Sequence, residues 1–387
     1  MRKLKILSHI PQKWIKLGRA FTALIISSIA LTSYASIEDD VVEQVEGARK
    51  IKAYKGRNEG TWLPVPIPVA NPTIGAGLQA ALLYLHPQTS SNPDVPNATS
   101  GIVGMYTDTD SWFAGGFHDG NLQDDRYRFR VLAGTGEFNL DFFGLGSDSS
   151  LRDNPVPYTI TSDSLFSQMM RRIPGTEDWY LGLRYMYIRS NVVFNTGGSN
   201  PGLPPISDDM TTSSLGLMAN YDSRDDNYYP TSGSYFEMVW MRDSDNWGSD
   251  FEFDRLTSFY NYYYSFSEKD VVALRTHVAN AHGDVPFYML PTLRLRGFPA
   301  GQYRDNTSLS AHLEWRRKFL PRWGYILFYE AGSVADSLDR IFQTNTITAY
   351  GGGVRWQVTE DKLLNLGVDV GFSEDDYAVY VSVGEKF

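Results

Sequence analysis

The residues that could do chemistry in this chain are arginines and carboxylates. The segment LRLRGFPAGQYRDN carries Arg294, Arg296 and Arg304 around a turn-forming run, residues 297–301. A guanidinium keeps its charge and fits a carboxylate with two hydrogen bonds, whereas Gly, Pro and Gly so close together argue against a regular strand. The pattern predicts a loop whose arginines need carboxylate partners wherever they are buried.

Nucleophilic and metal chemistry has less support. The chain has no cysteine, which removes thiol nucleophiles and zinc-thiolate sites, and its six histidines form no HExxH motif. Ser310 and His312 share a face, but a hydrolase also needs a third, orienting group. Asp222, Asp225 and Asp226 lack the glycine and terminal glutamate of a calcium loop. We therefore predict no catalytic residue, no metal and no cofactor.

The N-terminus indicates export. Residues 1–20 carry six basic residues and no acid, and an apolar run ends in small residues at Ser33 and Ala35. This pattern predicts a signal peptide over 1–35, cleaved near Ala35. Without it, 29 basic residues face 45 acidic ones, a net charge of −16, so nucleic acid is not an expected partner. No later window holds ~18 consecutive apolar residues.

Residues 36–72 are expected to be a periplasmic extension. Apolar residues at helical spacing in 37–53 predict a short amphipathic helix. The run TWLPVPIPVANP follows, and its prolines at 64, 66, 68 and 72 lack amide donors. We interpret this run as an extended linker or lid rather than a central strand.

Beyond Pro72 the side-chain pattern changes to a period of two, which is typical of strands. We predict sixteen strands: 73–86, 101–109, 111–119, 125–134, 136–143, 158–172, 178–190, 210–222, 233–243, 251–266, 270–281, 307–319, 323–335, 346–358, 362–372 and 377–387.

Alternation and gap lengths indicate the class of β protein. Segments of about ten residues with one apolar and one polar face are typical of transmembrane barrels. Long gaps follow predicted strands 1, 5, 7 and 11, and most even-numbered gaps are short, as expected of long external loops and short periplasmic turns. The exceptions are 223–232 and 373–376. A soluble all-β protein has no reason for this parity, so we predict a sixteen-stranded antiparallel transmembrane barrel over 73–387.

Three stretches resemble the BamA/TamA-type bacterial surface antigen family of outer-membrane barrels. NYDSRDDNYYPTSGSYFEM, residues 220–238, resembles its strand–turn–strand signature, with key residues Asp222, Arg224, Asp225, Pro230 and Gly233. LRLRGFPAGQYR resembles its Arg-Gly-aromatic loop motif. The blocks FYEAGSV, AYGGGVRWQV and VSVGEKF resemble its C-terminal strands. The resemblance covers residues 215–387 well.

The resemblance implies a lid loop that folds into the barrel. Its motif residues here are Arg296, Gly297 and Phe298. Alternation turns a wall of charges inward from four neighbouring strands: Glu314, Glu330, Arg355 and Asp369, together with Arg316. We expect Arg296 to bind Glu330 first, with Glu314 and Asp369 as second choices, and Phe298 to pack behind it. The alternative is that these charges merely line a wet lumen.

The same resemblance implies a function in outer-membrane biogenesis, by insertion or translocation of protein or lipid through a barrel seam. Residues 36–72 are too few for the POTRA domain that usually precedes such a barrel. The alternatives are a passive or plugged pore and a lipid-modifying enzyme. Expected partners are outer-membrane lipids, the barrel assembly machinery during insertion, and a separate periplasmic protein in place of the missing arm.

Two smaller features complete the expectations. Gly75 and Gly77 in the first predicted strand, and Gly384 in the last, give little side-chain packing, so we predict a weak seam between these strands. Phe387 ends an apolar face of residues 377–387 and is expected to act as the sorting signal. Glu385, which breaks that face, is expected near the periplasmic headgroups.

Overall fold

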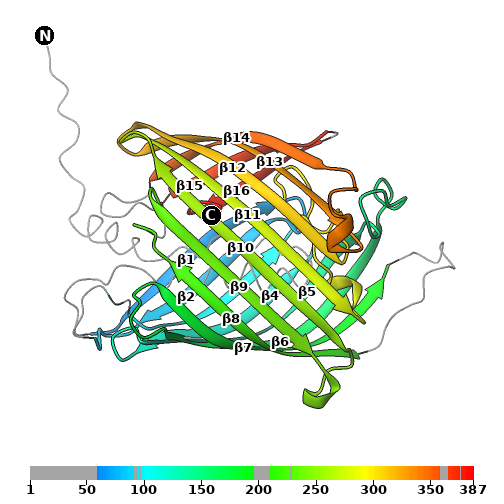
Figure 1. Cartoon of the computed structure of the whole chain (residues 1–387), viewed down its shortest axis with the longest axis horizontal. Helices are drawn as coiled ribbons and strands as arrows, with labels where there is room; N and C mark the ends of the chain where they lie inside the picture. The colour runs from blue at the N-terminus through cyan, green and yellow to red at the C-terminus, as the bar shows by residue number, and fades with distance from the viewer. Residues whose placement is uncertain are drawn as a thin grey trace, which may run out of the picture.

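The computed structural model describes residues 59–90, 95, 97–195, 209–226, 229–357, 365–374 and 376–387. Within these ranges sixteen strands form one closed antiparallel barrel, in which consecutive strands pair and β1 meets β16 (Figure 1). The same residues contain no helix long and apolar enough to cross a membrane. The predicted signal peptide and the helix at 37–53 lie outside the described residues.

The strands are β1 Thr61–Asn71, β2 Gly75–Leu85, β3 Thr99–Thr107, β4 Trp112–Leu122, β5 Tyr127–Phe142, β6 Val156–Arg172, β7 Trp179–Phe194, β8 Asp209–Asp222, β9 Gly233–Asp243, β10 Phe253–Ser265, β11 Asp270–Gly283, β12 Thr307–Leu320, β13 Trp323–Ala335, β14 Ile347–Gln357, β15 Asn365–Phe372 and β16 Tyr377–Val383. Three short 3-10 turns are η2 Asp245–Trp247, η3 Phe287–Met289 and η4 Leu338–Arg340.

The predicted alternation is confirmed along the strands. Outward-facing apolar side chains are about half exposed, as at Leu313 (50%) and Tyr350 (58%), whereas the inward-facing Glu314 and Glu330 are fully buried. An apolar belt outside and polar groups inside suit a barrel whose outer surface contacts hydrocarbon.

The lumen holds one large apolar cluster and several groups of buried charges. Inward-facing side chains of β1 to β10 form the apolar cluster, which also takes in Tyr288 and Met289 of η3. Buried ion pairs lie on the same strands, such as Arg184 with Glu237. The wall formed by β12 to β15 carries the charges that were predicted, among them Glu314, Arg316 and Arg355.

The proline-rich segment was wrongly predicted to be a linker. Residues Thr61–Asn71 are β1, and they pair with β2 over their full length. Prolines at alternate positions remove donors from one edge only, so the other edge of the strand keeps its hydrogen bonds. The barrel therefore begins at residue 61, and the strand predicted to be first is β2.

The count of sixteen was right through two compensating errors. The segments 125–134 and 136–143 were predicted as two strands, but β5 runs unbroken from Tyr127 to Phe142 and pairs with β6 along its whole length. Gly134 and Gly136 lie inside it without a turn. The long connection 86–98 follows an even-numbered strand. The predicted parity of gap lengths therefore holds only from β5 onward, apart from the connections 223–232 and 373–376.

The connection between β11 and β12, residues 284–306, is the longest in the barrel, and we call it the lid loop. We call the barrel end that carries the connections after odd-numbered strands the lid end, and the other the turn end. Leu293, Leu295 and Tyr303 of the lid loop form an apolar cluster with inward-facing residues of β13 and β14, so the loop lies inside the lumen. An isolated bridge between Thr292 and Arg304 closes it into a hairpin-like fold.

Candidate functional site

Arg296 lies at the centre of the inner wall. Its Nε donates to Glu330 Oε1 at 2.7 Å, and its backbone N–H donates to Glu330 Oε2 at 2.6 Å. Nη2 reaches Glu314 at 3.0 Å and Nη1 reaches Asp369 at 3.1 Å. The guanidinium also lies 3.3 Å from the centroid of the Phe328 ring. The structure thus brings Arg296 together with all three carboxylates that the sequence singled out.

Glycine at two positions allows this close approach. Gly297 has φ 97°, which L side chains rarely adopt, and its N–H donates to Tyr380 Oη at 2.9 Å. Opposite it, a Cβ on Gly371 of β15 would lie 2.7 Å from the Gly297 nitrogen and 2.8 Å from the Arg296 carbonyl carbon. The lid backbone therefore packs directly against the backbone of β15. Gly371 was not among the predicted site residues, although the alternation sets it on the inner face two residues after Asp369.

Phe298 does not pack behind Arg296 as expected. Its ring meets the Tyr303 ring edge-on, with centroids 5.4 Å apart, inside the lid loop. The aromatic ring that faces the guanidinium is Phe328 of β13. Phe298 thus stabilises the lid loop itself, and Phe328 stabilises its docking.

The C-terminal residues extend the charged wall, contrary to expectation. β16 ends at Val383, Gly384 turns the chain with φ 88°, and Glu385 to Phe387 enter the lumen. Glu385 accepts from Arg355 Nε at 2.8 Å, and Lys386 Nζ lies 2.9 Å from Glu330. The expected position of Glu385 at the headgroups is therefore wrong, and its break in the apolar face was the signal of an inward turn.

Phe387 is also inside the folded barrel and not on its lipid face. It is 5% exposed, and its backbone oxygen accepts from Arg316 Nη2 at 2.6 Å. If Phe387 is a sorting signal, as expected, it must be read before the barrel closes, because the folded barrel buries it. Around Arg296 the cluster now balances four cationic against four anionic side chains: Arg296, Arg316, Arg355 and Lys386 against Glu314, Glu330, Asp369 and Glu385.

Ser310, His312 and Glu330 have distances that resemble those of a hydrolase triad. Ser310 Oγ lies 2.9 Å from His312 Nε2, and His312 Nδ1 lies 3.2 Å from Glu330. However, Ser310 is only 2% exposed, and Glu330 is already held by Arg296 and Lys386. A nucleophile needs access to its substrate, so this geometry favours a structural function in orienting Glu330.

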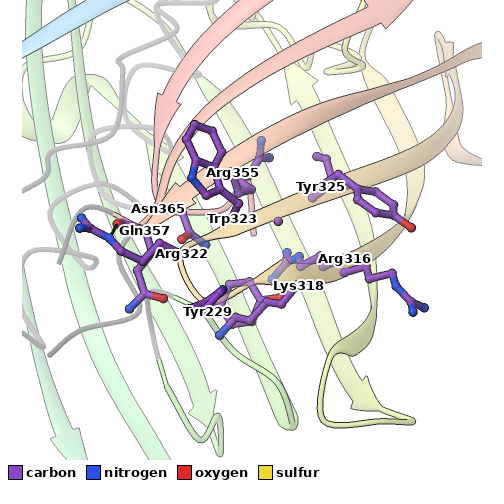
Figure 2. Close-up of a pocket in the computed structure, with 13 residues that line it drawn as sticks. Tyr229, Arg316, Lys318, Arg322, Trp323, Tyr325, Arg355, Gln357 and Asn365 are labelled. Carbon is purple, nitrogen blue, oxygen red and sulfur yellow. Dashed lines mark hydrogen bonds between the residues drawn. The ribbon is translucent and has the colours of Figure 1, made fainter. Parts of the chain in front are cut away.

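The strand–turn motif closes the turn end of the lumen. Arg224 Nε donates to Asp222 at 2.9 Å, and its guanidinium lies over the Tyr235 ring at 4.3 Å. Gly233 has φ 95° where β9 begins. Tyr229 and the buried Pro230 reach inward from the same turn. Tyr229 borders a small pocket (Figure 2). The basic side chains that line this pocket come from β12, β14 and the β12–β13 turn: Arg316, Arg317, Lys318, Arg322 and Arg355.

Asp225 holds the turn itself together. Its Oδ1 accepts from the backbone N–H groups of Thr231 at 2.9 Å, Ser232 at 3.1 Å and Asp226 at 3.0 Å. Burial raises the pKa of Asp225, but hydrogen bonds from the Thr231 hydroxyl and from these backbone N–H groups outweigh burial and hold the pKa below its usual value. The carboxylate is therefore the form that the folded turn prefers.

Asp225→Ala is expected to lower the free energy of unfolding by about 1 kcal/mol at pH 7, because charge-assisted hydrogen bonds at an exposed site are partly screened. A group with a depressed pKa stabilises the fold above its unfolded pKa, about 3.9 for Asp, and less as pH falls through the folded value. The difference from wild type, measured by urea unfolding, should shrink below about pH 4. Glu268→Ala in the β10–β11 turn is the control, and an equal loss there would contradict the assignment.

The seam lies one strand earlier than predicted. Gly75 and Gly77 belong to β2, which pairs with β1 and β3 and not with β16. β1 meets β16 in a single pair, Ala70 with Val381. By comparison, β1 and β2 pair over eleven positions and β15 and β16 over seven. The expected weak seam is therefore present between β1 and β16, but the glycines are not what weakens it.

Comparison with known proteins agrees with this architecture. Residues 106–387 match the Omp85 superfamily domain. BamA from Haemophilus ducreyi lacking POTRA domains 1–3 superposes with a TM-score of 0.57 at 16% identity, over 84% of this chain and 70% of that one. CdiB from Escherichia coli gives 0.57 at 12% identity, over 84% and 62%. CdiB from Acinetobacter baumannii gives 0.53 at 12% identity, over 84% and 60%.

No curated protein matches the sequence. At 12–16% identity, the likeness to the solved structures is one of fold. Family membership rests on the domain match over most of the chain. The matched region spans β4 to β16 and so includes the lid loop, the charged wall and the strand–turn motif. The chain belongs to the Omp85 superfamily and is an outer-membrane β-barrel with the fold of BamA and CdiB.

Proposed function

We propose that this barrel takes part in outer-membrane biogenesis by opening its β1–β16 seam to pass protein or lipid. The observation that carries the proposal is the single pairing between Ala70 and Val381. Unpaired backbone groups in hydrocarbon cost several kcal/mol each, so membrane barrels normally pair every strand fully. A junction with one pair is the one that opens at the lowest free-energy cost.

The docked lid loop supports the same proposal. The ionic cluster fixes the loop to β12, β13 and β15 and leaves the short β16 held mainly on its β15 side. A rigid wall beside a weak junction lets the seam open without unfolding the rest of the barrel. The proposed partners are membrane lipids, the assembly machinery that inserts the barrel, and a periplasmic protein that delivers substrate.

A plugged pore is the second candidate, because the lid loop fills part of the lumen. The two functions differ in what must move. A pore needs the loop to leave and the seam to stay closed. A biogenesis function needs the seam to open with the loop in place.

A disulfide across the seam should separate them. Ala70→Cys with Val381→Cys joins a hydrogen-bonded pair, whose Cα separation of about 5.5 Å suits a disulfide, and the native chain has no thiol. The oxidised protein should fold but fail to restore antibiotic resistance to a strain from which its gene has been deleted. Reductant should restore that activity. Ala70→Cys with Ala76→Cys, across β1 and β2, is the matched control. Full complementation by the oxidised seam variant would favour the pore.

A further inference from the structure

Three prolines of β1 lie on the edge that faces β16. The Asp108 N–H donates to the Ala76 carbonyl at 2.8 Å, and the His86 N–H donates to the Ala98 carbonyl at 2.9 Å. The backbone N–H and C=O groups of even-numbered β2 residues therefore point toward β3. Odd-numbered residues of β2 therefore bond to β1. The β1–β2 register is unbroken and pairs odd residues with odd ones. The backbone groups that face the seam consequently belong to the even-numbered residues of β1: Trp62, Pro64, Pro66, Pro68 and Ala70.

The β16 side has the matching geometry. The Gly384 N–H donates to the Asn365 carbonyl at 2.7 Å. The backbone groups of even-numbered β16 residues therefore point toward β15, and those of odd-numbered residues point toward the seam. Ala70 and Val381 are thus a hydrogen-bonded pair. Continued in both directions, this register sets Pro68 opposite Val383 and Pro72 opposite Val379. From residue 64 to 72, Ala70 is the one seam-facing position that is not proline.

An edge of this composition cannot template a β-strand. Strand addition depends on main-chain hydrogen bonds in both directions, and proline has no N–H to donate. The prolines also reduce the number of unpaired donors that an open seam would expose to hydrocarbon. The β1 edge can thus remain open in the bilayer without capturing a strand.

The surfaces on both sides of that edge are apolar. Outside, Trp62 is 63% exposed and the three prolines are exposed beside it. Inside, Leu63, Val65 and Val69 of β1 belong to the large apolar cluster of the lumen. This apolar surface continues from the lipid face through the seam into the barrel.

A polar side chain also lies on the inner face of β2. Gln79 of β2, which pairs with Ile67 of β1, is fully buried. Neither its Nε2 nor its Oε1 has a hydrogen-bond partner in the described part of the chain. A buried amide without a partner is costly, and its donor is free for an ester carbonyl or a similar acceptor.

We propose that the substrate of the seam is a phospholipid and not a β-strand. This inference rests on the function proposed above and names its substrate class. The acyl chains need no hydrogen-bond partner and follow the proline-lined edge and the apolar lumen wall. The ester region comes within reach of Gln79.

Lipid exchange in vesicles tests the proposal. The full chain is reconstituted in phosphatidylethanolamine–phosphatidylglycerol vesicles with a trace of fluorescent NBD-phosphatidylethanolamine, and dithionite bleaches label that reaches the outer leaflet. Wild type should expose label that protein-free vesicles protect. The double variant Pro68→Val, Pro72→Val, at the positions that this register sets opposite Val383 and Val379, should lower the exchange rate about tenfold or more, because restored donors favour a closed seam. Pro157→Val, at an exposed proline of β6, should leave the rate unchanged.

Two further arms separate the possible failures. Gln79→Leu should slow exchange without lowering thermal stability, which a structural function alone would not produce. Insertion of a urea-unfolded eight-stranded barrel into the same vesicles should not be accelerated by the wild-type chain. Acceleration that is abolished by the seam disulfide, formed in the Ala70→Cys, Val381→Cys variant, would overturn the lipid inference while supporting the gate. Lipid exchange that is unaffected by the seam disulfide would overturn the inference and count against the gate as well.

Discussion

Arg296→Ala is expected to lower the free energy of unfolding of the barrel by about 3 kcal/mol. Removing one member of a buried ionic cluster leaves its partners charged without compensation, which typically costs about 3–5 kcal/mol. The lower end applies here because each carboxylate keeps a second cation: Lys386 for Glu330, Arg316 for Glu314 and Arg355 for Asp369. Urea unfolding in vesicles, followed by tryptophan fluorescence, measures the loss.

The same variant should release the lid loop. Trypsin should cut faster after Arg304, a site that all the variants keep, once the loop leaves the wall. Arg296→Lys should recover only part of the stability, because an ammonium cannot reach three carboxylates in the fork geometry. Arg294→Ala, a partly exposed arginine two residues earlier, is the control. If both alanine variants unfold and digest like wild type, the charges merely line a wet lumen.

Gly371→Ala is expected to have a comparable effect from the opposite side of the contact. The new Cβ would lie 2.7 Å from the Gly297 nitrogen and 2.8 Å from the Arg296 carbonyl carbon, so the backbone of the lid loop would have to move. Overpacking typically costs about 1–3 kcal/mol, and here it also displaces Arg296 from its carboxylates. We expect a lid loop that trypsin cleaves readily in a barrel that still forms.

A glycine on another strand serves as the control that separates the loss of the lid contact from a general cost of replacing a strand glycine by alanine. Gly116 of β4 has its nearest neighbouring atoms at 3.5 and 3.8 Å from an added Cβ, which is ordinary contact. Gly116→Ala should therefore leave both stability and trypsin cleavage near wild type. Equal behaviour of the two variants would show that the lid loop does not depend on close backbone contact at Gly371.

Residue type and period alone determined much of this protein. Alternation of apolar and polar residues predicted a transmembrane barrel and its inward faces, because a strand sends successive side chains to opposite sides. It also turned Glu314, Glu330 and Asp369 into the lumen. The docking of Arg296 on them was implied by the resemblance of its loop to the family motif and not by the alternation.

Positions that depend on distant partners were not predictable in this way. The proline-rich segment resembled a linker, since the rule that excludes proline from strands assumes two paired edges, and only the closed barrel shows that β1 has one. The inward turn at Gly384 depends on Arg355 and Asn365, which are contributed by other strands. Tertiary structure decided the seam, the fourth carboxylate and the backbone contact at Gly371, because each depends on which strand lies next to which, and pairing between strands is set by the whole barrel and not by local sequence.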